Sequence, residues 1–170
     1  YPRNYHFSIV MAGILSELHQ FREALAIARD LERGITSGRP PFAPQLKPRH
    51  DQLLGRIYFN QGDYARAAAA YETALSLDST NADAWYVLAG LRYELGEMAT
   101  AAQAAQEAVN RAPDMLDAQR LLAETRLSLG EAATALPAAE AAVRLAPDDP
   151  TTHALLGDVR LNLEQWPEAA

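Results

Sequence analysis

Hydrophobic residues recur along this chain in steps of three or four, the spacing of one face of an α-helix. Between Trp85 and Leu95 the apolar positions include Leu88 and Leu91, and a similar series begins at Leu53. Such spacing over about 14 residues predicts amphipathic helices. An alanine-rich stretch of similar length follows each series, as in residues 64–77. The pattern therefore predicts an all-α fold built from pairs of helices.

A glycine followed by an acidic residue separates the two helices of each expected pair. The glycines are Gly62, Gly96 and Gly130, and the acids are Asp63, Glu97 and Glu131. Glycine accepts the left-handed backbone conformation that often ends a helix. The acid stands where the second helix begins, and its negative charge suits the positive end of that helix. Pro113 and Pro147 lie at the joints between successive pairs.

The same kinds of residue return every 34 positions. Besides the glycines, four columns are in register: Leu54, Leu88, Leu122 and Leu156; Gly55, Ala89, Ala123 and Gly157; Ala67, Ala101, Ala135 and Ala169; and Ala74, Ala108 and Ala142. Small side chains let two helices approach at the short end of the usual range of about 8–10 Å between axes. One pair cannot bury its apolar face alone, so we expect successive pairs to stack on their neighbours.

These columns resemble the tetratricopeptide repeat, a helix–turn–helix family with a 34-residue unit. The residues that carry the match are Trp85, Leu88, Ala89, Gly96, Ala101, Ala108 and Pro113 in one unit, and Leu54, Gly55, Tyr58, Gly62, Tyr64, Ala67, Tyr71 and Ala74 in the unit before it. A fainter unit at about 5–38 has Met11, Ala12, Leu15, Phe21, Ala24 and Leu31 in register. The resemblance implies an α-solenoid, a right-handed superhelix of antiparallel helix pairs.

We expect one array over residues 1–170, with about four and a half to five repeats. The units would span about 5–38, 48–81, 82–115, 116–149 and a truncated 150–170, with a proline-rich insert at about 39–47. Because the chain opens on Tyr1 and stops inside an expected helix, we expect it to be a fragment of a longer protein. Its first expected helix is apolar nearly all round, which favours cover by another element.

Three features depart from the family pattern. Arg92, Arg126 and Arg160 stand where Tyr58 carries the family's aromatic residue, and Ala105 and Ala139 stand where Tyr71 does. The two alanines predict thinner, less stable later units. Pro137 falls inside an expected helix, where a proline costs about 3 kcal/mol, so we expect a kink or a late helix start.

The family's usual role, protein–protein recognition, is what the resemblance implies here. A partner peptide or helix would lie in a concave groove lined by the first helices. The repeat register gives these groove-facing candidates: Arg49, Gln52, Arg56, Phe59, Asn60, Asp83, Tyr86, Tyr93, Glu94, Arg120 and Glu124. Aromatic and arginine side chains dominate binding hot spots, which favours Phe59, Tyr86, Tyr93, Arg56 and Arg120.

The sequence argues against one recognition mode known in this family, the capture of a C-terminal carboxylate. That mode uses Lys, Asn and Arg on the first helices, whereas Gln52, Tyr86 and Glu94 stand here.

The arginine column at 92, 126 and 160 has two interpretations. It is either an anion-binding stripe, or a row of side chains whose aliphatic stems cover the helix junction and whose charged groups pair with acids such as Glu94 or Glu124. The second interpretation, pairing with nearby acids, is favoured. Phe42 in the insert lies either in a surface loop or against a partner.

Composition excludes several other functions. The 170 residues carry a net charge of −7, which argues against nucleic acid as a partner. The longest uncharged apolar run, residues 4–16, is too short to insert across a membrane. The chain has no cysteine, and its four histidines match no metal-ligand spacing, so we expect no metal and no cofactor. No phosphate-binding glycine loop or nucleophile motif is present, so we expect no enzyme activity in this chain.

Two alternatives to an adaptor remain open. The chain could be a docking or regulatory arm of a larger enzyme, or a module that self-associates through the open ends of the solenoid. The compartment is not determined, although a cytoplasmic location is slightly favoured over a periplasmic one. The alanine-rich, arginine-over-lysine composition is associated with bacterial genomes of high GC content.

Overall fold

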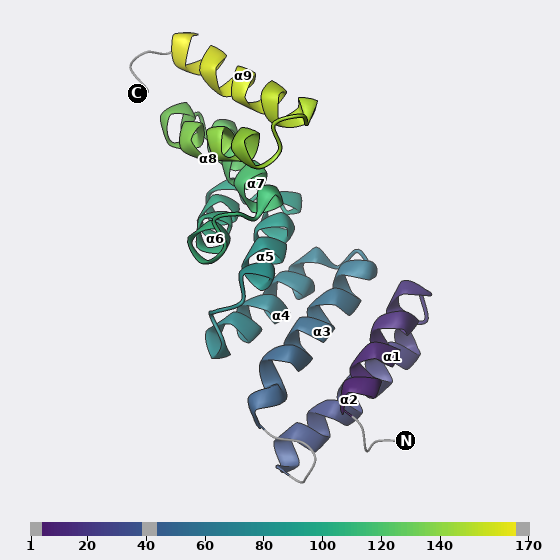
Figure 1. Ribbon diagram of the computed structural model, residues 1–170. Coiled ribbons are helices and arrows are strands. Elements are labelled where there is room, and N and C mark those ends of the chain that lie inside the picture. The colour runs from purple at the N-terminus through teal and green to yellow at the C-terminus, as the bar shows by residue number, and fades with distance from the viewer. Residues whose placement is uncertain (1–4, 39–43, 166–170) are drawn as a thin grey trace. The chain divides into compact units, whose positions relative to one another are not determined.

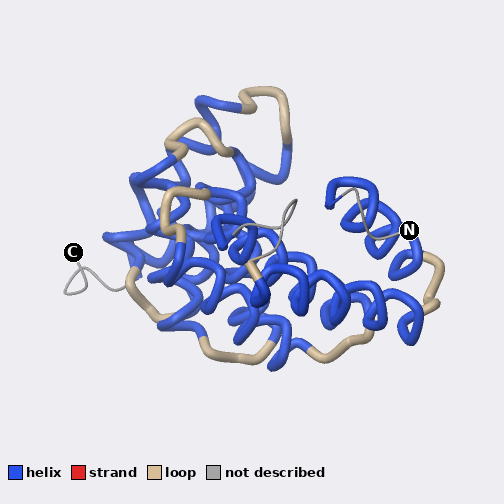
Figure 2. Tube along the Cα trace, turned by 90° about the horizontal axis from the view of Figure 1, so that it is seen from below, coloured by secondary structure: helices blue, strands red, loops and turns tan. Residues whose placement is uncertain are grey.

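The computed structural model describes residues 5–38 and 44–165, and every regular element in these ranges is helical (Figure 1). Contacts divide the chain into two compact units, residues 1–80 and 81–170. Short loops join the two helices of each pair (Figure 2). In the described ranges, no helix has both the length and the apolar character that crossing a membrane requires. The architecture is an all-α helical repeat, as the hydrophobic pattern predicted.

The described part of the first unit consists of two antiparallel helix pairs. The first pair is α1 (Tyr5–Glu17) and α2 (Phe21–Ser37), and the second is α3 (Lys47–Asn60) and α4 (Tyr64–Leu77). A short 3-10 helix, η1 (Pro44–Leu46), leads into α3. Both α1 and α2 pack against α3. Residues 39–43 of the insert, including Phe42, lie outside the described residues.

The described part of the second unit contains two pairs and one further helix. Its elements are α5 (Ala82–Glu94), α6 (Met98–Arg111), α7 (Leu116–Ser128), α8 (Ala132–Leu145) and α9 (Pro150–Gln165). Within pairs, α5 packs on α6 and α7 on α8, while α6 packs on α7 and α8 on α9 between them. Each helix therefore contacts mainly its neighbours in sequence, as stacked repeats do.

The turns within the pairs have the backbone conformation that the glycines predicted. Gly62, Gly96 and Gly130 have φ angles of +77°, +76° and +76°. In the first pair the same register position is occupied by His19, with a φ of +59°. This left-handed conformation is uncommon for a residue with a side chain, so the turn between α1 and α2 is the strained member of the set.

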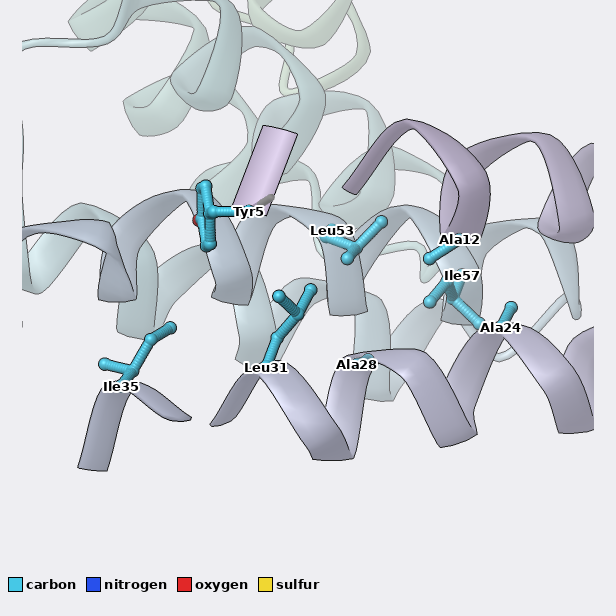
Figure 3. Close-up of a cluster of buried hydrophobic side chains, with 8 residues drawn as sticks. All are labelled: Tyr5, Ala12, Ala24, Ala28, Leu31, Ile35, Leu53 and Ile57. Atoms are coloured by element: carbon cyan, nitrogen blue, oxygen red, sulfur yellow. The ribbon is translucent and has the colours of Figure 1, made fainter. Parts of the chain in front are cut away.

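The core of the first unit forms where α1, α2 and α3 meet. Tyr5 and Ala12 of α1, Leu53 and Ile57 of α3, and four residues of α2 are all buried and lie close together (Figure 3). The α2 residues are Ala24, Ala28, Leu31 and Ile35. Alanines at two of these positions keep α2 close to its neighbours, while the larger side chains fill the remaining space.

The small-residue columns are buried in most units, although Gly157 is exposed and Ala169 lies outside the described residues. The alanines at 67, 101 and 135, and those at 74, 108 and 142, have no exposed surface. A Cβ added at Gly55 would lie 2.6 Å from the ring of Tyr71, so only glycine leaves room for that ring. In the next two units Ala89 and Ala123 stand in the Gly55 column, and the buried Ala105 and Ala139 replace the tyrosine. The space between these two columns is thus filled either by a glycine and a tyrosine or by two alanines.

Pro137 does not delay the start of its helix, so that part of the expectation is wrong. The helix α8 begins at Ala132, 34 residues after α6 begins at Met98, and it continues through Pro137 to Leu145. The Pro137 side chain is exposed. Its ring therefore lies on the outer side of α8, where it meets solvent rather than a packed neighbour.

The outer face of α1 is apolar and exposed. Phe7, Val10, Ile14 and Leu18 lie three or four residues apart and are 54%, 55%, 46% and 63% exposed. This spacing places them on one side of the helix. We call these four residues the α1 stripe. An exposed stripe of this kind is typical of a surface that another element covers.

Candidate functional site

The first unit has a hollow of about 310 Å³ between α1 and α3. It is lined by His6 and Ile9 of α1, by Arg49, Gln52, Leu53 and Arg56 of α3, and by Tyr71 of α4. No carboxylate is among these residues. Neither arginine forms an ion pair with any described residue. The hollow is therefore positively charged although the chain as a whole is acidic. Below, it is called the arginine hollow.

Contacts between α1 and α3 fix the walls of the arginine hollow. At one end, the Tyr5 hydroxyl donates a hydrogen bond to the Leu46 carbonyl oxygen at 2.9 Å. At the other, the Asn60 side-chain amide donates to the Ser16 hydroxyl at 2.9 Å. These two bonds hold the helices side by side in the same direction along the length of the hollow.

Arg56 occupies space that a glycine leaves open. A Cβ at Gly13 would lie 1.8 Å from the Arg56 Nη2 atom, so the guanidinium lies against the backbone of α1. Burial raises the pKa of Tyr71, which lines the same hollow, while the charge of Arg56 lowers it by a smaller amount. The Tyr71 hydroxyl therefore stays protonated near neutral pH and can donate a hydrogen bond.

The second unit has a hollow of about 250 Å³ between α5 and α7. Its lining is Tyr86 of α5 with Asp117, Arg120, Leu121 and Glu124 of α7. The Arg120 Nε atom is buried and has no hydrogen-bond partner among the described residues. Burial raises the pKa of Tyr86, and the charge of Asp117 raises it further. Unlike the arginine hollow, this site presents both signs of charge around an aromatic ring.

The candidates from the repeat register divide into two groups. Six of them line the two hollows: Arg49, Gln52 and Arg56 in the first unit, and Tyr86, Arg120 and Glu124 in the second. The remaining five do not line either hollow: Phe59, Asn60, Asp83, Tyr93 and Glu94. Phe59 is 46% exposed and packs against Tyr64, with ring centroids 5.7 Å apart. Asn60 is used in the α1–α3 contact.

The arginine column forms ion pairs, although with other acids than expected. Arg92 pairs with Glu97 and Arg126 with Glu131, each across the turn within its own pair, while Arg160 lies 3.5 Å from Glu140 of α8. Glu94 and Glu124 are not the partners in these pairs. Where Tyr58 replaces the arginine, the acid is the shorter Asp63, which accepts a hydrogen bond from the Arg66 backbone amide and caps α4.

Sequence reasoning missed a buried polar cluster at the start of α3. His50 is fully buried, with Nε2 2.9 Å from the Ala28 carbonyl oxygen and Nδ1 3.1 Å from Asp51 Oδ1. Lys47 Nζ lies 2.5 Å from the same Asp51 oxygen. The repeat gave no signal for this cluster, because the column of Asp51 holds Trp85, Gln119 and His153 in the later units. Among the described residues, no group of three or more His, Asp or Glu side chains could hold a metal ion.

A family model described as tetratricopeptide repeat matches residues 53–115, 99–150 and 120–170. The chain belongs to the tetratricopeptide repeat family. This fold is typically a module for protein interaction rather than catalysis. A search of curated proteins found no match.

Solved structures of other tetratricopeptide repeat proteins share the fold. YrrB, described as having an unusual peptide-binding site, is 20% identical with a TM-score of 0.78 over 95% of this chain and 79% of its own. MamA is 20% identical with a TM-score of 0.72, over 95% of this chain and 86% of its own. The second repeat domain of human RPAP3, in complex with an HSP70 peptide, is 19% identical with a TM-score of 0.64, over 69% of this chain and 98% of its own.

Proposed function

We propose that this chain is a protein-interaction module that binds a peptide or helix of a partner protein along its first helices. The observation that carries the proposal is the position of the two hollows. Each lies between first helices of adjacent pairs, α1 with α3 and α5 with α7. The RPAP3 domain in complex with an HSP70 peptide supports the proposal, because a similar fold binds a peptide of another protein there.

The proposed binding residues are the eleven that the repeat register gives. Those lining the hollows supply the specific contacts: Arg49, Gln52, Arg56, Tyr86, Arg120 and Glu124. Arginine and tyrosine offer large contact areas with few lost rotamers, which suits anchor residues. Phe59, Asn60, Asp83, Tyr93 and Glu94 flank them on the same helices and would contact the partner at its margins.

The proposal is tested by selecting peptides from a random library displayed on phage against the immobilised 170-residue chain. The selected peptides are then titrated against a variant with Arg56→Glu and Tyr86→Ala, one change in each hollow. We expect binding to fall by more than about tenfold, because both substitutions remove anchor side chains.

A matched control separates loss of the site from loss of the fold. The control variant carries Arg22→Glu and Gln103→Ala, exposed positions on the second helices α2 and α6. Both variants should melt within a few degrees of the wild type, and the control should bind the selected peptides normally. If no peptide is selected, or if the control loses binding as strongly as the hollow variant, the proposed function is wrong.

Self-association is a second candidate function, favoured by the α1 stripe. The four exposed apolar side chains of the α1 stripe give a surface on which a second copy could pack. Sedimentation velocity over a range of concentrations would detect a dimer. Under this candidate, Val10→Glu and Ile14→Glu would convert the dimer to a monomer. A chain that stays monomeric at all concentrations would exclude it.

A further inference from the structure

The arginine hollow has the charge and the spacing to recognise a particular feature of a partner peptide. Arg49 and Arg56 lie seven residues apart on one face of α3, so their Cα atoms are separated by about 10.5 Å along the helix axis. Both side chains line the same hollow, and no carboxylate of the lining neutralises them. Two cationic side chains are therefore available to a ligand from helix positions whose separation is fixed.

The size of the hollow limits what it can hold. At about 310 Å³ it is at the lower end of small-ligand pockets, so it accommodates side chains of a peptide rather than a whole peptide. The other lining residues are the apolar Ile9 and Leu53, together with His6, Gln52 and Tyr71. Arginine binds carboxylates through two parallel hydrogen bonds, and such charge-assisted bonds are about twice as strong as neutral ones.

We propose that the arginine hollow binds two acidic side chains, three residues apart, on an extended segment of the partner. In a polyproline II segment, residues i and i+3 lie on the same side about 9.3 Å apart, close to the separation of the two arginines. In a β-strand, residues on one side are i and i+2, only about 6.7 Å apart. The pairing of one carboxylate with each guanidinium therefore favours the i, i+3 spacing.

Because Arg56 packs against Gly13, the position of its guanidinium can be changed without changing the charge of the hollow. The guanidinium is held where a Cβ on α1 would displace it. A Gly13→Ala substitution keeps every charge of the hollow but moves one of its two cations. Because the displaced group is the far end of a flexible side chain, and alanine favours a helix more than glycine does, this variant should fold normally.

The inference rests on the proposed function, and its test uses peptides without free termini. The probe is the acetylated and amidated peptide Pro-Pro-Glu-Pro-Pro-Glu-Pro-Pro, titrated into the isotopically labelled 170-residue chain and followed by nuclear magnetic resonance. We expect the peptide to change the chemical shifts of α1, α3 and Tyr71 and to leave those of the other residues unchanged. The same peptide with both glutamates replaced by glutamine should bind at least about tenfold more weakly, because the charge-assisted bonds are lost.

Three variants assign the effect to the hollow. Arg49→Gln and Arg56→Gln should each weaken binding by about fivefold or more, and Gly13→Ala should weaken it although no charge changes. Arg22→Gln on α2 removes the same charge elsewhere and should leave binding unchanged. Raising the salt concentration should weaken binding of the glutamate peptide, since these charges are near the surface.

Several outcomes would overturn the inference. Equal binding of the glutamate and glutamine peptides would do so, as would equal losses in Arg22→Gln and Arg56→Gln. Tighter binding of a peptide with a single phosphoserine would show that both arginines converge on one phosphoryl group instead. If the phage selection yields peptides that depend on Tyr86 while the glutamate peptide does not bind, this inference fails and the proposed function stands. If the selection yields none, both fail.

Discussion

At the residue scale, the turn within the first pair differs from its three counterparts by one side chain. His19 has a φ of +59°, where Gly62, Gly96 and Gly130 have nearly the same conformation without a Cβ. For a residue with a side chain, this left-handed conformation is about 1–2 kcal/mol less favourable than the right-handed one. The edge-to-face contact of the His19 ring with Phe21, at 5.5 Å between centroids, offsets part of this strain energy.

His19→Gly should therefore stabilise the protein by about 0.5–1 kcal/mol, because relief of backbone strain outweighs the lost ring contact. Urea denaturation followed by circular dichroism measures the change. The matched control is Gly62→Ala, which puts a Cβ into the same conformation and should destabilise the protein by about 1 kcal/mol or more. A destabilising His19→Gly would show that the histidine side chain holds the turn by contacts stronger than the strain.

The Gly55–Tyr71 contact makes a second prediction at the residue scale. Gly55→Ala alone should cost about 1–3 kcal/mol, because its Cβ would lie 2.6 Å from the tyrosine ring and 3.3 Å from the Ala67 carbonyl oxygen. Tyr71→Ala alone should cost about 3–5 kcal/mol through the cavity that it leaves. The double variant reproduces the alanine–alanine pair of the later units, so its cost should be less than the sum. Additive costs in denaturation experiments would contradict this coupling.

At the element scale, the cluster of Lys47, His50 and Asp51 joins α3 to α2. Burial would raise the pKa of Asp51, but hydrogen bonds from His50 and Lys47, together with their charges, outweigh it and lower the pKa below its ordinary value. A carboxyl whose pKa is lowered by folding stabilises the folded state above its unfolded pKa of about 3.9, and this contribution is lost as the pH falls through the folded pKa.

Lys47→Met should therefore destabilise the protein at pH 7, and its deficit relative to the wild type should shrink as the pH falls below about 4. The reason is that the substitution removes a hydrogen bond and a positive charge that favour the ionised Asp51. Urea midpoints between pH 3 and pH 7 measure the effect. The control Arg33→Met breaks the exposed pair with Asp30, which contributes little, and should change the midpoints only slightly at any pH. A deficit for Lys47→Met that does not vary with pH would contradict the prediction.

Helix boundaries were predictable from sequence because the turn residues recur with the period of the apolar positions. The α4, α6 and α8 helices begin at Tyr64, Met98 and Ala132, each directly after the acid that follows the glycine. Side-chain partners were less predictable. Arg92 pairs with Glu97 and not Glu94, because the turn after the helix brings residue i+5 back to it. Periodicity gives the face of a helix, but the path of the following loop decides which charge meets it.

At the whole-molecule scale, the repeat register correctly pointed to six residues that line the two hollows. It did not predict the charge of either hollow. The positive charge of the first depends on α1, where His6 and Gly13 belong to the faintest repeat and where the family model finds no match. The buried His50 cluster was missed for a similar reason, since the column of Asp51 holds a different type of residue in each unit and so gives no spacing signal. Irregular positions of a repeat carry its individual function, and these are where pattern arguments are weakest.

The division into two compact units makes a prediction about folding. Residues 1–80 and 81–170 each bury a core of their own, the first around Leu53 and Ile57 and the second around Leu88 and Leu122. In stacked repeats stability is close to a sum over units and their neighbour contacts, so each half should fold when produced alone. Circular dichroism should show a helical spectrum and a cooperative thermal transition for each half. The arginine hollow is made only of residues before Thr80, so the first half alone should bind the glutamate peptide as the whole chain does. A first half that is unfolded would show that its core needs the second unit.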